Sequence, residues 1–440
     1  MDVHDYRQFG RLWKWILVSL VIGPATALTV AGFDRALDAL AGITPGIFAS
    51  APYLLPIAGA VATGLLILRF APGAGGEGIP RYLIAVNRDH GRISARDTFL
   101  KIPATLVTLG TYGCGGIVGP LSRIGAGIGS HVTGLVFRIF HISDEGIPRI
   151  AAICGVSGII SSIFHAPVAG GIFAVEILCS DAMRYSDIFP SIMTGCTAYI
   201  TSAMIIGDAP VFSIAAPAAP AEASAYLWLP LVAVAAGAAG LVFIVTFERI
   251  SRFMKRIPLG QPGPALVSGL ALGILWLAGF RWVLGTSPHL FDALATGDLA
   301  VMAEEVPHAG GAALLILIVM IVKIVGTSIT IGGGLSAGFT GPMLLTGLSS
   351  GALIAALAGA DMGGPTYYML MACSTAAVLG AALNVPVAAI LLVTGIFGRD
   401  YFLAAAIGAT LAFVIYKDRT IYEYSISRWP AVIDKRHREL

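Results

Sequence analysis

The chain has 440 residues, of which 57% are hydrophobic and only 12% are charged, and its formal net charge is +2. A soluble domain carries roughly 25% charged residues, so this composition excludes a soluble globular protein, and no basic run indicates a nucleic-acid partner. Several apolar runs reach the ~20 residues that span a bilayer, which predicts an all-α, polytopic membrane protein. The runs cover residues 12–32, 52–70, 103–112, 150–178, 189–206, 226–246, 265–284, 312–331, 343–358, 368–397 and 402–416.

Basic residues gather at both ends of the chain. The first apolar run has no small-residue cleavage site, so it is not read as a signal peptide, and it is preceded by His4, Arg7, Arg11 and Lys14. The last residues include Arg428, Lys435, Arg436, His437 and Arg438. Because Lys and Arg mark cytoplasmic flanks, we expect a multi-pass protein of the cell (inner) membrane with both termini in the cytoplasm. About 24 residues follow the last apolar run, so no cytoplasmic regulatory domain is expected.

Three glycine-rich segments interrupt the apolar runs, and each ends in a proline. They are Gly73–Pro80, Gly113–Pro120 and Gly332–Pro342. Proline is favoured at the first position of a helix, so a helix is predicted to begin at the end of each segment. A helix N-terminus offers unpaired N–H groups and a partial positive charge, and glycine lets a ligand approach the backbone. The segments therefore predict an anion site. The alternative is that Gly and Pro only permit close packing or kinks.

Three features of the first half recur in the second at nearly constant spacing: a lysine, a Gly-Pro pair and an apolar stretch around a proline. The matched positions are Lys101 with Lys323 (323 − 101 = 222), Pro120 with Pro342 (342 − 120 = 222) and Pro167 with Pro386 (386 − 167 = 219). Breaks at corresponding places in duplicated halves point to a midplane substrate site in transporters. The pattern predicts two inverted-topology halves, residues 1–215 and 216–440, whose broken helices meet at an anion site.

These stretches resemble motifs of the CLC family of chloride channels and proton-coupled chloride exchangers. Gly76–Pro80 (GEGIP) is similar to the family's GSGIP, Gly116–Pro120 (GIVGP) to its GKEGP or GREGP, and Gly338–Pro342 (GFTGP) to its GxFxP. Tyr422 stands where the family has a late filter tyrosine. The resemblance covers most of the chain and implies a homodimer with one anion pathway per subunit.

The resemblance also implies which residues form the selectivity filter. Backbone N–H groups near Phe339 and Thr340 and the hydroxyl group of Tyr422 are expected to hold the anion. The residues carried over are Glu77, Gly78, Ile79, Pro80, Gly116, Val118, Gly119, Pro120, Gly338, Phe339, Thr340 and Tyr422. No motif of catalytic residues or metal ligands is present, so we expect no enzyme, no metal and no cofactor. The expected partners are chloride or another small anion, the lipid bilayer and a second copy of the chain.

Two carboxylates on which proton coupling in the family depends are missing. Val118 replaces the gating glutamate of GKEGP, and Ile177, which follows Glu176, replaces the inner proton glutamate. Neither side chain titrates. The resemblance with these departures predicts passive, channel-like chloride conduction uncoupled from protons. The alternatives are an anion/proton exchanger in which Glu77 substitutes for the gate, and a non-transporting membrane scaffold.

Glu77 and Arg123 are further departures, since the family has serine and glutamine at these positions. A carboxylate at an anion site is repulsive unless it is paired or protonated, and a lone buried arginine is costly. One interpretation is therefore an ion pair between Glu77 and Arg123. In a second interpretation Glu77 is the substitute gate, and in a third its side chain turns away to the cytoplasmic vestibule.

Thr340 and Lys101 leave alternatives open. Thr340 stands where the family's filter has a phenylalanine, and its hydroxyl group either favours an anion such as fluoride or bicarbonate or only fills space. Lys101 matches a family lysine. An intramembrane lysine is a functional candidate, so Lys101 either draws anions into the pathway or caps helix ends.

Overall fold

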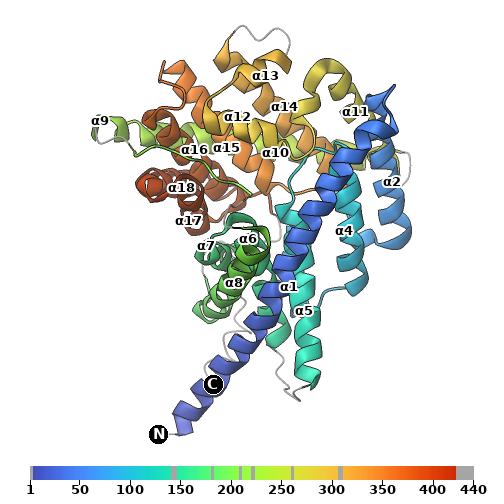
Figure 1. The fold of residues 1–440 in the computed structure, drawn as a ribbon, viewed down its shortest axis with the longest axis vertical. Helices are drawn as coiled ribbons and strands as arrows, with labels where there is room; N and C mark the ends of the chain where they lie inside the picture. The colour runs from blue at the N-terminus through green and yellow to red at the C-terminus, as the bar shows by residue number, and fades with distance from the viewer. Residues whose placement is uncertain are drawn as a thin grey trace.

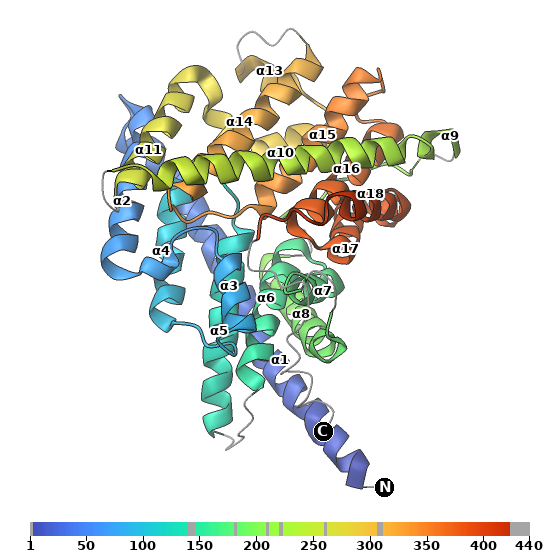
Figure 2. The same cartoon turned by 180° about the vertical axis from the view of Figure 1, so that it is seen from behind.

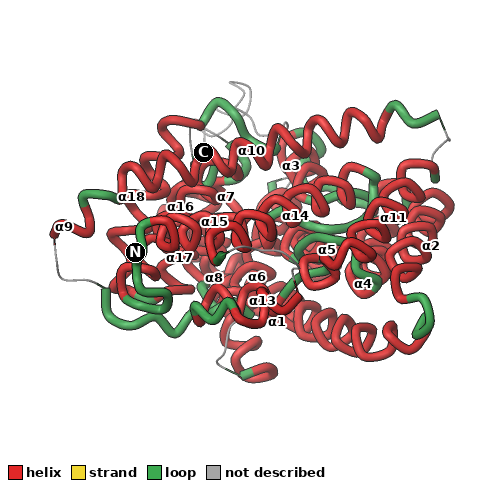
Figure 3. The backbone as a smooth tube through the Cα atoms, turned by 90° about the horizontal axis from the view of Figure 1, so that it is seen from above, coloured by secondary structure: helices red, strands yellow, loops and turns green. Residues whose placement is uncertain are grey.

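Helices make up most of the computed structural model (Figure 3), which describes residues 3–139, 146–179, 183–207, 211–219, 223–258, 262–305 and 311–422. The helices of the first half are α1 (Val3–Ile47), α2 (Leu55–Phe70), α3 (Ile79–Asn87), α4 (Ala95–Gly110), α5 (Val118–Ile139), α6 (Ile147–Phe164), α7 (Pro167–Glu176) and α8 (Tyr185–Ile206). Those of the second half are α9 (Ala223–Tyr226), α10 (Leu229–Lys255), α11 (Gly263–Leu275), α12 (Pro288–Thr296), α13 (Ala300–Glu305), α14 (Ala312–Gly332), α15 (Thr340–Leu357), α16 (Pro365–Leu383), α17 (Pro386–Phe397) and α18 (Phe402–Tyr416). Short turns lie between some of them: η1 (Pro52–Leu54), η2 (Pro72–Ala74), η3 (Trp276–Phe280), η4 (Arg281–Val283) and η5 (Arg399–Tyr401).

Ten helical stretches among these described residues are long and apolar enough to cross a membrane. They differ in how much protein surrounds them: 94% of the apolar window of α16 is buried, against 28% of that of α2. A helix that is apolar on all sides, such as α16, belongs inside a large protein or a membrane. The prediction of a polytopic all-α protein is therefore confirmed.

The two halves occupy different parts of the molecule. In Figure 1 the long α1 crosses the view obliquely beside α4, α5 and α8, and the yellow to red helices of the second half lie mainly above. Seen from behind, α10 crosses α14, α15 and α16 (Figure 2), against all of which it packs. The boundary predicted at 215/216 falls in the irregular segment 211–219 and stays a prediction.

Helix ends repeat between the halves. The residue that follows α6 is His165 (φ 50°, ψ 34°) and the residue that follows α16 is Asn384 (φ 62°, ψ 42°), and both have the left-handed conformation. Each is followed two residues later by the proline that opens α7 or α17. A left-handed residue other than glycine is uncommon, so its recurrence before matched prolines shows that the two segments share one local structure.

The starts of α5 and α15 are joined by an antiparallel bridge between Gly116 and Gly338. The N–H of Gly116 donates to the carbonyl of Gly338 at 2.9 Å, and the N–H of Gly338 donates to the carbonyl of Gly116 at 2.7 Å. The two glycines are separated by the spacing of the matched lysines (338 − 116 = 222). Corresponding residues of the halves therefore pair with each other and run in opposite directions, as a two-fold relation between inverted halves requires.

Small residues allow the helices behind these starts to pack closely. A Cβ atom on Gly155 of α6 would overlap the carbonyl oxygen of Gly125 in α5. A Cβ atom on Gly347 of α15 would meet the Cα atom of Thr375 in α16 at 2.5 Å. Small residues at helix contacts are typical of membrane proteins, where van der Waals packing drives association.

Some predictions cannot be compared with the structure. The C-terminal basic residues used to orient the chain lie outside the described residues: Arg428, Lys435, Arg436, His437 and Arg438. The cytoplasmic placement of the termini therefore stays a prediction.

Candidate functional site

Three helix N-termini meet at the junction of the glycine-rich segments. The α3 helix begins at Ile79, α5 at Val118 and α15 at Thr340, so each segment leads into a helix as predicted. Besides the Gly116–Gly338 bridge, the N–H of Gly76 donates to the carbonyl of Gly334 at 3.3 Å. The unpaired N–H groups and partial positive charges of three helices are therefore collected in one place. We call this place the junction.

The carboxylate group of Glu77 occupies the junction. The residue is 4% exposed. Its Oε2 accepts a hydrogen bond from the backbone N–H of Ile79 at 2.6 Å, and its Oε1 accepts one from the hydroxyl group of Tyr422 at 3.1 Å. The backbone of Phe339 also lies near this carboxylate. One of the donors predicted to hold a small anion, the hydroxyl group of Tyr422, is therefore already bound to an anionic group of the chain itself, and the N–H of Ile79 is a further donor to that group.

Two glycines make room for this arrangement. A Cβ atom on Gly119 would overlap the Glu77 carboxylate, and one on Gly78 would meet the carbonyl oxygen of Gly119 at 2.7 Å. Gly78 also has φ 119°, a conformation that glycine adopts without steric cost. Any side chain at Gly119 would therefore exclude the Glu77 carboxylate from its position.

Tyr422 and Thr340 supply hydroxyl groups beside these N–H donors. Tyr422 is 1% exposed and donates to Glu77. The hydroxyl oxygen of Thr340, at the first position of α15, is buried beside the hydroxyl group of Tyr422, and no hydrogen bond of full geometry satisfies it among the described residues. An unpaired buried hydroxyl group costs free energy, so Thr340 is a polar group to which a bound anion can supply the missing partner. Neighbouring Phe339 packs its ring edge-on against Phe247, with centroids 4.7 Å apart.

Lys101 fastens the loop that carries Glu77. Its Nζ donates to the carbonyl groups of Ala74 and Gly76, both at 3.0 Å, and to the hydroxyl group of Ser336 at 3.1 Å. The ammonium group is completely buried, and its charge attracts that of Glu77. Lys101 therefore holds backbone carbonyls and brings positive charge close to Glu77, while its role in drawing anions into the pathway stays a prediction.

The matched lysine of the second half repeats this arrangement. The Nζ of Lys323 donates to the carbonyl groups of Val283 and Gly285, at 3.2 and 2.9 Å, and to the hydroxyl group of Ser287 at 2.7 Å. The loop there leads into α12 at Pro288, which lacks the N–H that Ile79 donates in the first half. The duplicated loop has therefore kept its lysine anchor without the donor that binds Glu77.

Arg123 does not pair with Glu77, so that expected ion pair is wrong. The Nη1 of Arg123 donates a long hydrogen bond to the hydroxyl group of Thr98 in α4 (3.4 Å), and its Nε is buried without a hydrogen-bond partner. No ion pair joins Glu77 and Arg123 among the described residues. A backbone N–H and a tyrosine hydroxyl satisfy the carboxylate instead, and the side chain of Glu77 is not turned away from the junction.

The two positions where the resemblance implies proton-carrying glutamates are apolar and enclosed. Val118 is the first residue of α5, and Ile177 follows the last residue of α7. Both are 1% exposed. Neither side chain can take up a proton, and neither position is open to water.

The structure adds residues that the sequence did not single out. The hydroxyl groups of Ser336 and Thr105 are hydrogen-bonded to each other (2.8 Å), and Ser336 accepts a hydrogen bond from Lys101. Ser287 likewise accepts a hydrogen bond from Lys323. Ser336 lies inside the glycine-rich segment Gly332–Pro342, which the sequence had already indicated as part of the site. The loop at Ser287 contains one glycine between Val283 and Pro288 and gave no comparable signal.

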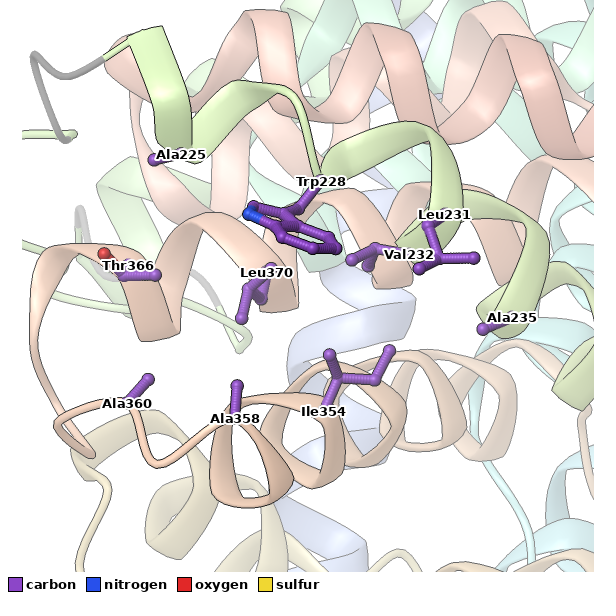
Figure 4. A pocket seen from close by; sticks show the side chains of 10 residues that line it. All are labelled: Ala225, Trp228, Leu231, Val232, Ala235, Ile354, Ala358, Ala360, Thr366 and Leu370. Carbon is purple, nitrogen blue, oxygen red and sulfur yellow. The ribbon is translucent and has the colours of Figure 1, made fainter.

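A cavity of about 630 Å³ lies elsewhere, where α10, α15 and α16 face one another (Figure 4). Figure 4 shows Trp228, Leu231 and Val232 of the α10 end facing Ile354 and Leu370. Nine of its ten lining residues are apolar and the tenth is Thr366. Such a lining offers almost no donors to an anion, so this cavity is separate from the junction in place and in chemistry.

Comparison with known proteins finds similar sequences along most of the chain. The family profile described as voltage gated chloride channel matches residues 58–417. The chain is 24% identical over 427 residues to a chloride/fluoride channel protein of Pseudomonas syringae pv. tomato, across 93% of this chain and 85% of that protein. It is 25% identical over 437 residues to the H(+)/Cl(-) exchange transporter ClcA of Salmonella arizonae, across 94% of this chain and 88% of that protein.

The fold is also shared with a solved structure. A crystal structure described as a CLC-type fluoride/proton antiporter superposes with a TM-score of 0.80 and 22% sequence identity, across 94% of this chain and 98% of that chain. This match concerns the fold, and it confirms the predicted class of polytopic helical architecture with broken helices.

Proposed function

We propose, because this chain belongs to the voltage gated chloride channel (CLC) family, that it carries chloride across the membrane through the junction of α3, α5 and α15. The observation that carries this proposal is the binding of the Glu77 carboxylate by the N–H of Ile79 and the hydroxyl group of Tyr422. These donors are enclosed, carry no full positive charge and hold a negative group. Donors of this kind bind an anion without trapping it.

Glu77 then acts as a tethered competitor of the transported anion. Chloride and the carboxylate need the same N–H and hydroxyl donors, so the anion occupies the junction only when Glu77 leaves it. Departure requires a rotamer change of one side chain. The carboxylate and chloride each carry one negative charge, so their exchange leaves the net charge beside Lys101 unchanged.

We further propose that transport is passive and not stoichiometrically coupled to protons. Support comes from Val118 and Ile177, two enclosed apolar side chains where the family has proton-carrying carboxylates. Neither of these two side chains offers a proton an intermediate stop. Purified protein in proteoliposomes with a chloride gradient and a trapped pH dye tests this. Chloride should leave the vesicles without sustained uphill proton movement, and uphill proton movement driven by chloride would overturn the passive proposal.

The second candidate is anion/proton exchange with Glu77 as the proton carrier. The position of its carboxylate among the anion donors favours this candidate, and relatives described as exchangers share the family. The same vesicle assay separates the two, since an exchanger moves protons against their gradient at a fixed ratio to chloride. The Glu77→Gln variant would then lose proton movement and keep chloride movement.

The transported anion is proposed as chloride, with fluoride and bicarbonate as competitors. Relatives are described with both chloride and fluoride. The buried hydroxyl group of Thr340 offers an additional donor to an anion that accepts hydrogen bonds strongly. Flux measured with each anion in turn decides the order of preference.

Placement and assembly belong to the same proposal. We propose a homodimer in the inner membrane, with one pathway per subunit and both termini in the cytoplasm. Accessibility of cysteines placed at either terminus to an impermeant reagent in intact cells tests the orientation, and the mass of the purified particle tests the assembly.

A further inference from the structure

The carboxylate group of Glu176 closes the N-terminus of α17 from the other half of the chain. Its Oε1 accepts from the N–H of Val387 at 2.9 Å and its Oε2 from the N–H of Ala388 at 2.7 Å. The first residue of α17 is Pro386, which has no N–H, and no side-chain cap comes from Val385 at the N-cap position. One buried carboxylate therefore satisfies two N–H groups of the first turn, at the positive end of the helix.

Among the described residues, the matching start of α7 has no counterpart of this cap. The position that corresponds to Glu176 is Gly395, at the spacing of the matched prolines (395 − 176 = 219). A Cβ atom on Gly395 would lie 3.6 Å from the Cβ atom of Ala166 at the start of α7. The start of α7 therefore forms without a carboxylate cap, whereas the start of α17 has one. The cap is thus specific to the surroundings of α17.

The segment that carries Tyr422 is bonded to the connection between α16 and α17. Only Asn384 and Val385 separate the two helices. The carbonyl oxygen of Ala382, in the last turn of α16, accepts hydrogen bonds from the N–H of Ile421 at 3.0 Å and from the hydroxyl group of Thr420 at 3.2 Å. The Thr420 hydroxyl also accepts from the N–H of Tyr422 at 3.3 Å. The last carbonyls of a helix have no partner within it, so this carbonyl is free to hold the Tyr422 segment.

We propose that Glu176 is a positioning residue for Tyr422. By holding the first turn of α17, it holds the two-residue connection and with it the Ala382 carbonyl from which the Tyr422 segment hangs. Figures 1 and 2 both show α7 beside α17, and the two helices pack against each other. A continuous series of contacts thus connects the Glu176 carboxylate of the first half with the Tyr422 hydroxyl group in the junction. This inference rests on the proposed anion site, since the Tyr422 hydroxyl is the group delivered there.

A first experiment follows the position of the segment without any anion transport. Hydrogen exchange of the full-length protein is compared for wild type, Glu176→Gln and Asp187→Asn. Asp187 is the matched control, a buried carboxylate paired with Arg149 at 2.8 Å and absent from the contacts above. The Gln variant should speed exchange at Val387–Ala388 and at 420–422, and the Asn variant should not. Faster exchange at Val387–Ala388 alone would overturn the proposal.

A second experiment measures anion affinity in chains with Glu77→Ala, where the tethered carboxylate no longer competes. Adding Glu176→Gln should weaken chloride binding about tenfold, the effect of losing roughly one hydrogen bond to the anion. Adding Tyr422→Phe should weaken it to a similar extent, and the two changes together should be no worse than Tyr422→Phe alone. Additive losses, or an unchanged affinity with Glu176→Gln, would overturn the inference. Absence of chloride binding in every chain would overturn the proposed function instead, while hydrogen exchange still judges the positioning role.

Discussion

Replacing Glu77 with alanine tests the competition at the junction most directly. In the wild type the carboxylate is held by the N–H of Ile79 at 2.6 Å and by the hydroxyl group of Tyr422 at 3.1 Å. A hydrogen bond to a charged group contributes about 1.5–3 kcal/mol. If one such bond favours the position of Glu77 inside the junction, the carboxylate is absent from the junction in about a tenth of the molecules or fewer. Chloride binds only to these molecules, so its apparent affinity is reduced by that fraction. Glu77→Ala should therefore bind chloride about 10- to 100-fold more tightly.

The assay is calorimetric titration of the purified protein with chloride, together with chloride efflux from proteoliposomes. Protonation removes the charge of the Glu77 carboxylate and weakens its hold on the Ile79 N–H. Wild-type affinity and flux should therefore rise as pH falls, and Glu77→Gln should lose this dependence. Asp97→Asn is the matched control, because it removes a carboxylate charge near Lys101 without vacating the donors. A folded Glu77→Ala protein whose affinity and pH dependence equal those of the wild type would refute the reasoning.

Further outcomes are expected for four other substitutions. Gly119→Ala places a Cβ atom where the Glu77 carboxylate lies. Because the competing anion is proposed to occupy the same place, this substitution should weaken chloride binding in the Glu77→Ala chain, and an unchanged affinity there would contradict the shared position. Lys101→Met leaves two carbonyl groups and a serine hydroxyl without their donor. It should therefore lower the free energy of unfolding by about 3 kcal/mol or more. Lys323→Met should lower the free energy of unfolding similarly but leave chloride affinity nearly unchanged, whereas Lys101→Met should also weaken chloride binding. Equal losses of chloride affinity in the two variants would show that Lys101 acts only on the fold. Thr340→Val removes the buried hydroxyl group and should lower flux of fluoride relative to chloride; an unchanged ratio would assign Thr340 to space filling.

The junction also explains how the chain tolerates valine where a gating carboxylate is expected. The starts of α3 and α5 approach so closely that Gly78 contacts Gly119. A carboxylate from the Gly73–Pro80 loop therefore reaches the first turn of α5, where a glutamate at position 118 would begin. In the proposed mechanism the competing carboxylate is therefore attached at position 77 instead of position 118.

Much of the architecture was determined by the sequence alone. Apolar runs of bilayer length and three Gly/Pro breaks specify helices and their starting points locally, because backbone groups inside a membrane must be satisfied within a helix. The recurrence of Lys101 at Lys323 and of Pro120 at Pro342 indicated duplication without any structure. The family motifs placed Glu77 and Tyr422 in one site.

Only the tertiary structure decided which side chains meet there. The partner of Glu77 is Tyr422, which lies 345 residues away in the sequence, and the donors to Glu176 lie 211 and 212 residues away. Opposite charges suggested that Glu77 would pair with Arg123, but the guanidinium group extends to Thr98. Charge alone does not select a partner in a buried site, since a backbone N–H or a hydroxyl group satisfies a carboxylate as well. The packing of distant helices determines which of these donors is within reach.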